Sequence, residues 1–120
     1  MKQKIGHFSK KVIDLLNLDI EPGTPIYMSD SNVQHMKTSH PGDYARYFNN
    51  IESILDHPDY VGKNPSDDSI EFVKEYKIDG DYVKVAVRIS SGGLFYARSL
   101  YVLNSNRTFN FIAKGTLKKV

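Results

Sequence analysis

A change in hydrophobic period near residue 70 limits what this chain can fold into more than any other feature. Beyond that point apolar and polar residues alternate, which is the pattern of half-buried β-strands. Asp79-Gly80 is a strong hairpin signal, and the polar segments 90–93 and 104–107 supply two further turns. These turns separate four predicted strands, over residues 70–78, 82–89, 94–103 and 109–114. The C-terminal half therefore predicts a four-stranded antiparallel sheet.

The first half of the chain has the spacing of helices instead. Apolar residues at helical steps predict an amphipathic N-terminal helix over residues 4–16, within the segment 1–20. The turn-forming residues at 21–25 end it. A second set of apolar residues at three- and four-residue steps predicts a longer helix over residues 44–55.

The segment between these two helices predicts a strand followed by a short helix. Ile26–Met28 fits a very short strand, and residues 29–32 are all good N-caps. A helix that opens there must stop near His40, because Pro41 restricts the residue before it. Helices that precede the sheet predict an α+β two-layer domain, with N-terminal helices packed on the C-terminal four-stranded antiparallel sheet.

Length and composition fit one ordinary globular domain. The 120 residues predict a single domain over 1–120, and 40% hydrophobic residues are enough for one core. The chain has no cysteine, which excludes disulfides and thiolate metal sites and favours the cytoplasm. No apolar stretch is long enough to cross a bilayer. The net charge of +2 permits nucleic-acid binding without requiring it.

The predicted middle strand of the sheet separates apolar from basic residues. Four apolar residues at alternate positions, from Val83 to Ile89, share the face expected against the helices. Lys84 and Arg88 lie on the other face. In the next strand, Arg98 and Ser99 are the unusual residues of a largely apolar run. Two basic strands side by side would concentrate positive charge on an open face that attracts a phosphodiester.

Proton-transferring side chains are densest in the segment 31–44, which contains His35, Lys37 and His40. On a continuous helix, His35 and His40 would point to different sides, so they could serve one substrate only if the helix breaks between them. Pro41 provides such a break at His40, and Lys37 and His40 could share a face. The predicted site is therefore a cleft between this segment and the strands that carry Arg88 and Arg98.

Each of these residues also has an ordinary structural explanation. A histidine is more often a surface or capping residue than a catalyst, and Lys84 and Arg88 on an exposed sheet face are commonly solubilising charge. Ser99 in a strand can be a small packing residue. The chain has no glycine-rich phosphate loop, no helical zinc motif and no serine-hydrolase elbow. We therefore expect neither a metal nor a cofactor.

Five short segments together resemble the barnase–EndoU–colicin–RelE (BECR) group of RNase folds. More narrowly, they resemble the nuclease-like members of that group found in phages and other mobile elements. The segments are HMKTSHP at 35–41, residues 49–55, PDYV at 58–61, VAVR at 85–88 and RSLY at 98–101. The resemblance covers roughly residues 25–113 and leaves the predicted first helix outside its best-matching part.

The resemblance implies a metal-independent endoribonuclease, in which the RNA 2′-hydroxyl attacks the adjacent phosphate. Such a reaction needs a general base, a general acid and cations for the charge that develops on phosphate. Carried over by position, the implied roles are acid and base for His35 and His40, phosphate binding for Lys37, Arg88 and Arg98, and hydrogen bonding or base stacking for Ser99 and Tyr101.

Two other functions stay open. Members of the group vary their catalytic residues widely, so a catalytically inactive RNA- or protein-binding module on the same fold is the alternative. The resemblance also implies a toxin or effector of a mobile element, whose partners would be an RNA substrate and an antitoxin or immunity protein. The basic N-terminal segment 1–20 could dock such a partner or a second copy of the chain.

Overall fold

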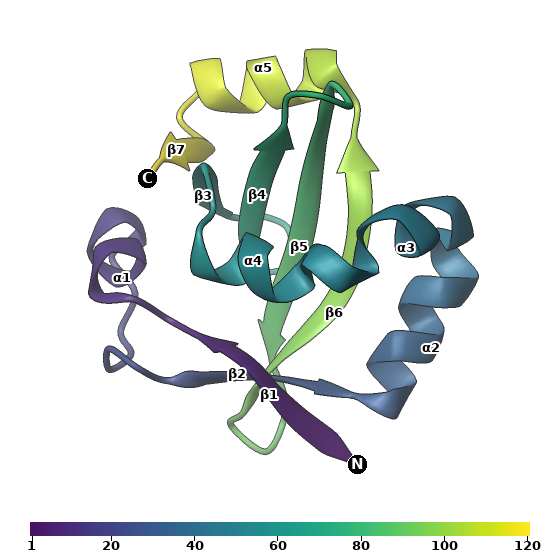
Figure 1. Ribbon diagram of the computed structural model, residues 1–120. Helices are drawn as coiled ribbons and strands as arrows, with labels where there is room; N and C mark the ends of the chain where they lie inside the picture. The colour runs from purple at the N-terminus through teal and green to yellow at the C-terminus, as the bar shows by residue number, and fades with distance from the viewer.

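The computed structural model describes residues 1–120 as an α+β domain built on one mixed sheet of seven strands (Figure 1). The strands lie across the sheet in the order β1-β2-β6-β5-β4-β3-β7, and only β2 and β6 run parallel. In chain order they are β1 Lys2–His7, β2 Pro25–Ser29, β3 Tyr60–Lys63, β4 Ile70–Tyr76, β5 Asp81–Ile89, β6 Phe95–Leu103 and β7 Leu117–Lys119. The predicted α+β class is confirmed, but the predicted sheet of four antiparallel strands is wrong.

The helices are short and are not confined to the N-terminal half. They are α1 Lys10–Leu16, α2 Asp30–Ser39, α3 Pro41–Tyr47, the 3-10 turn η1 Phe48–Asn50, α4 Ile51–Asp56 and α5 Ser105–Ala113. The helix predicted over 44–55 is therefore three consecutive helical segments. No helix here has the length and apolar character needed to span a membrane.

The N-terminal segment is half strand and half helix, which corrects the prediction of one helix over 4–16. Residues 2–7 form the edge strand β1, which pairs antiparallel with β2. Ser9 has an extended backbone, and its hydroxyl accepts a hydrogen bond from the Val12 N–H at 3.2 Å, so α1 starts only after it. The helical spacing was coincidental, because Ile5 reaches the core from β1 and Phe8 from the connection to α1.

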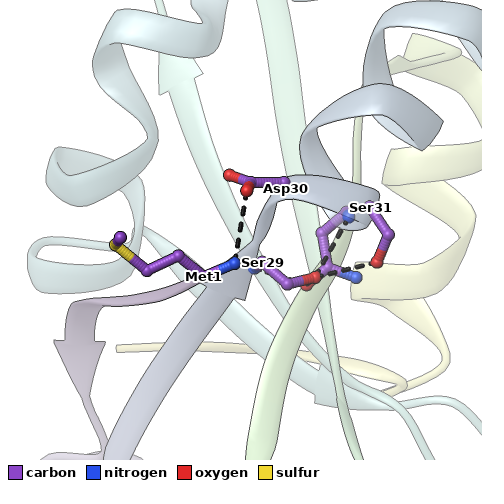
Figure 2. Close-up of polar contacts among 5 residues, drawn as sticks. Met1, Ser29, Asp30 and Ser31 are labelled. Carbon is purple, nitrogen blue, oxygen red and sulfur yellow. Dashed lines mark hydrogen bonds and ion pairs between the residues drawn. The ribbon is translucent and has the colours of Figure 1, made fainter.

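Helix α2 begins and ends where the sequence predicts. The Ser29 hydroxyl accepts a hydrogen bond from the Asn32 N–H at 3.2 Å, and the Asn32 side chain accepts one from the Ser29 N–H at 2.9 Å. Figure 2 shows this end of the helix, where the Ser31 hydroxyl also lies 2.9 Å from that of Ser29. The helix ends at Ser39, and Pro41 opens α3, so the chain changes direction at His40.

Residues 109–114, predicted to be the fourth strand, are mostly helical. The Asn104 side chain accepts hydrogen bonds from the N–H groups of Asn106 at 2.9 Å and Arg107 at 3.3 Å, which starts α5. The sheet is extended elsewhere, by β1 and β2 on one side and by β3 and β7 on the other.

One face of the sheet packs on the main hydrophobic core. Val83, Val85 and Val87 on this face are fully buried, as predicted, together with residues of α1, α2 and α4. Figure 1 shows α4 lying over this face. Ile89 was expected on the same face but is 60% exposed. The pairing of β5 with β6 shifts between Ala86 and Val87, and Ile89 lies at the end of the strand beyond this irregularity.

The opposite face of the sheet, which we call the open face, is covered only at one end. Helix α5 crosses the sheet there (Figure 1), and a small second cluster forms where Val73, Leu103 and Leu117 pack against Phe111 and Ile112. Along the rest of β5 and β6 no helix crosses this face, and α2 and α3 border it at the β6 edge.

Candidate active site on the open face of the sheet

A buried ion pair lies at the centre of the open face. The Lys84 ammonium lies 2.8 Å from the Glu71 carboxylate, and the two residues are 8% and 5% exposed. Burial lowers the pKa of Lys84, but hydrogen bonds to Glu71 and Tyr101 outweigh this effect and raise it above its usual value. Lys84 therefore stays charged at neutral pH as one half of an ion pair with Glu71 beneath the open face.

Tyr101 links this ion pair to a histidine. Its ring lies 4.7 Å from the Lys84 ammonium, and on β6 it is paired directly with Lys84 of β5. The His40 imidazole stacks on the same ring, with centroids 4.7 Å apart and planes inclined by 24°. Lys84 comes from the strand on one side of β6, and His40 comes from the junction of α2 and α3. The break at Pro41 thus brings His40 to the open face.

The α2–α3 junction is tied to the edge of β6 by an acidic side chain. The Asp43 carboxylate of α3 accepts a hydrogen bond from the Val102 N–H of β6 at 3.0 Å. This N–H has no partner on a neighbouring strand, because β2 pairs with β6 only at Phe95 and Tyr96. A side chain in the first turn of α3 therefore takes the place of a neighbouring strand and positions His40 beside Tyr101.

A cavity of about 610 Å³ opens beside this cluster. Glu71, Lys84 and Tyr101 form part of its wall. Arg107 of α5 and Lys114, which ends α5, add two further cationic side chains, and neither makes an ion pair. We call this hollow the central cleft. Its charge suits an anionic ligand.

Arg88 and Arg98 form a second basic pocket further along the sheet. They line a hollow of about 270 Å³ together with Tyr96 and with hydroxyl and amide side chains from the start of α2 and the β5–β6 turn. Neither arginine makes an ion pair, so both guanidinium groups are free to bind an anion. We call this the arginine pocket. Arg88 follows Lys84 by four residues, which places it ~13 Å along β5.

The remaining predicted site residues lie at different distances from these hollows. Ser99 pairs with Ala86 on the open face, between the two pockets. His35 is exposed, with its ring nitrogen 3.5 Å from the Ser39 hydroxyl, and lies one helical turn after Ser31 of the arginine pocket. Lys37 lies elsewhere, with its ammonium 5.6 Å from the Tyr44 ring, and lines neither pocket.

Sequence reasoning missed Glu71, Arg107 and Lys114, and it placed Lys84 on the basic face without including it among the site residues. A signal for the ion pair was present. The Asp79-Gly80 turn sets the register of the β4–β5 hairpin, which pairs Glu71 with Ala86 and Val73 with Lys84. Glu71 and Lys84 are then diagonal neighbours on one face. Arg107 and Lys114 had no such signal, because their segment was expected to be a turn and a strand. Nowhere do three metal-ligating side chains gather around one point.

The fold and the site define a small nuclease-like α+β protein, with a helix-covered face and a basic open face on one sheet. Residues 3–110 match the family model described as phage-Barnase-EndoU-ColicinE5/D-RelE like nuclease 3, and the chain belongs to this family. The match confirms the resemblance and extends it through β1 and α1, which the sequence motifs had left outside. Comparisons with curated proteins and with solved structures returned no match.

Proposed function

We propose that the protein is a metal-independent endoribonuclease that cleaves RNA by attack of a 2′-hydroxyl on the adjacent phosphate. The observation that carries this proposal is the His40–Tyr101–Lys84 arrangement on the open face. It joins a proton-transferring group, through the Tyr101 ring, to the buried Lys84–Glu71 ion pair in the wall of a cleft that also carries Arg107 and Lys114. Membership in a nuclease family supports a nucleic-acid substrate.

Each step of the reaction has a candidate group on this face or beside it on α2. A histidine suits proton transfer because its ordinary pKa lies near neutral pH, so His40 would act as acid or base at the scissile phosphate. Lys84 would stabilise the negative charge that develops there. Arg88 and Arg98 would bind phosphate in the arginine pocket, with His35 as the second proton-transferring group on the adjacent side of α2.

Tyr101 and Ser99 would position the substrate between these groups. The Tyr101 ring would do so indirectly, by holding His40, because the imidazole stacks on it and the Lys84 ammonium lies over it, and the Ser99 hydroxyl can bond to the ribose or phosphate. Lys37 has no contact with either pocket, so we assign it no step. With this activity, the protein would act as a toxin or effector of a phage or other mobile element. An antitoxin or immunity protein that covers the open face would inhibit it.

The experiment is cleavage of a single-stranded RNA in the presence of a metal chelator, with analysis of the product ends. We expect products that end in a 2′,3′-cyclic phosphate. We also expect no cleavage of the matched oligonucleotide in which every ribose lacks the 2′-hydroxyl. Equal cleavage of both oligonucleotides would contradict the mechanism. Binding of the RNA without cleavage would establish the alternative function, an inactive RNA-binding module.

A further inference from the structure

A third basic hollow lies beyond the open face, at the β7 edge of the sheet. It has a volume of about 350 Å³ and lies between α1 and the turn that connects α5 to β7. Lys63, Lys114 and Lys118 contribute its charged side chains. We call it the lysine groove. None of its lysines belongs to the predicted site.

The lysine groove adjoins the central cleft. Pro65, Lys114 and Thr116 line both hollows, and we call them the ridge between the two. A ligand that leaves the central cleft over this ridge enters the groove directly. Lys114 is exposed on the ridge and can contact a ligand on either side. The two hollows therefore share the cation Lys114, with Arg107 in the central cleft and Lys63 and Lys118 in the lysine groove.

The backbone at this ridge is built for close approach. Gly62 of β3 pairs with Leu117 of β7, and a Cβ atom at Gly62 would collide with the Thr116 carbonyl oxygen. The absence of a side chain lets the Thr116–Lys118 segment lie tightly against β3, which aligns Lys118 with the strand that carries Lys63. Two of the three lysines of the groove, Lys63 and Lys118, thus come from paired strands.

Little acidic charge offsets these lysines. Lys114 and Lys118 make no ion pair, and Lys63 lies 3.9 Å from the carboxylate of Asp68, a contact in which both side chains are at least half exposed. An exposed pair of this kind is weak and gives way readily to a stronger anion. The groove therefore keeps its attraction for phosphate.

We infer that the lysine groove binds the phosphate backbone of RNA that flanks the segment held on the open face. This rests on the proposed function, because it assigns a further contact to the same substrate. Lysine binds phosphate as a point charge, without base readout, so the contact is independent of sequence. It makes binding depend on RNA length, because only a strand that spans the ridge reaches Lys63 and Lys118.

The test compares two double variants that remove the same charge. Lys63→Gln/Lys118→Gln alters the groove, and Lys2→Gln/Lys4→Gln alters β1, at the opposite edge of the sheet. The ligands are fluorescent 2′-O-methyl RNAs, which lack the attacking hydroxyl, in a short form of about four nucleotides and a long form of about twelve. Affinity is measured by anisotropy over a range of salt concentrations, and folding is checked by circular dichroism.

We expect the groove variant to bind the long RNA at least about fivefold more weakly than the parent, with a salt slope smaller by about one. Its affinity for the short RNA should equal that of the parent, and the β1 variant should match the parent with both. Equal weakening by both variants, or no effect of the groove variant, would overturn the inference. Tighter binding of a polyaspartate peptide than of either RNA, whatever the RNA length, would also overturn the inference, because the groove would then favour an acidic peptide. Cleavage of the short unmodified RNA by the parent protein is measured separately. If the parent cleaves this RNA but the groove variant shows no binding defect, the inference about the groove fails and the proposed function stands.

Discussion

The His40 imidazole stacks on the Tyr101 ring with a centroid separation of 4.7 Å, although the two residues are 61 positions apart in the chain. The Asp43–Val102 hydrogen bond on the same α3–β6 contact keeps this arrangement in place. Tyr101 is thus a positioning residue for His40. The stacking geometry leads to a prediction that separates the ring from its hydroxyl.

Tyr101→Ala should reduce RNA cleavage by about 100-fold, because a histidine without its stacking partner leaves the productive geometry. Tyr101→Phe should keep most of the activity, since the ring remains. Steady-state rates on one RNA measure both, with circular dichroism as the check on folding. Equal losses in the two variants would show that the hydroxyl, rather than the stacking, carries the contribution of Tyr101.

The buried Glu71–Lys84 pair should show strong coupling in a double-mutant cycle. Either Glu71→Gln or Lys84→Met alone should lower the free energy of unfolding by ~3–5 kcal/mol, because each removes one charge of the pair and leaves the other buried without a counter-charge. The double variant should recover most of that loss, since both charges are gone. Urea unfolding measures all four proteins.

The same double variant also separates stability from catalysis. It should remain folded yet cleave RNA poorly, because the cation near Tyr101 is missing. If the two single losses simply add in the double variant, the pair is not coupled and its role in organising the site is wrong.

The hairpin register shows how far the sequence could predict this site. The Asp79-Gly80 turn and the alternation of β5 predict that Lys84 and Arg88 share one face, and the structure agrees. The stop at Pro41 likewise predicts that His40 leaves the helix. The partner of His40 was not predictable, because it depends on how α3 packs against the edge of β6, a contact between segments far apart in the chain.

The errors in the fold have a similar cause. Short apolar runs fit helix or strand equally well, and tertiary pairing decides between them. Residues 2–7 become a strand because β2 is available to pair with them, and residues 105–113 become a helix because Asn104 caps them. The parallel contact between β2 and β6 could not be read from the sequence, since no local turn connects the two strands.

Gly62→Ala should destabilise the protein by ~1–3 kcal/mol, because the added methyl group collides with the Thr116 backbone and must push β7 away from β3. Gly42→Ala is the matched control. A Cβ atom there meets nothing within 4 Å, and the residue lies in the first turn of α3. The control should be neutral or slightly stabilising. Thermal unfolding compares the two, and equal melting temperatures would refute the close packing at Gly62.

Tyr47 should make stability depend on alkaline pH. Its buried hydroxyl donates hydrogen bonds to Asp79, at 3.1 Å, and to Asp81. Burial raises the pKa of Tyr47 well above its ordinary value, and the hydrogen bonds to Asp81 and Asp79 raise it further. The neutral hydroxyl therefore stabilises the fold in full below the unfolded-state pKa of about 10, and this contribution is lost as the pH rises toward the folded-state pKa.

Tyr47→Phe should accordingly lower the free energy of unfolding by about 1–2 kcal/mol near neutral pH. The difference between the parent and the variant should shrink above about pH 10. Urea unfolding at neutral pH and at about pH 10.5 measures it. A difference that stays constant across this range would mean that the pKa of Tyr47 is the same in the folded and unfolded states.

The rate of RNA cleavage by His40→Ala tests the central claim most directly. General acid–base catalysis by one side chain contributes about 100- to 10,000-fold, so we predict a loss in this range, with the fold and the RNA affinity unchanged. His35→Ala, which alters an exposed histidine on the adjacent helix, is measured beside it and should also lose activity if both histidines transfer protons. Undiminished cleavage by His40→Ala would contradict the account, because the reaction would then proceed without a proton-transferring group beside Tyr101.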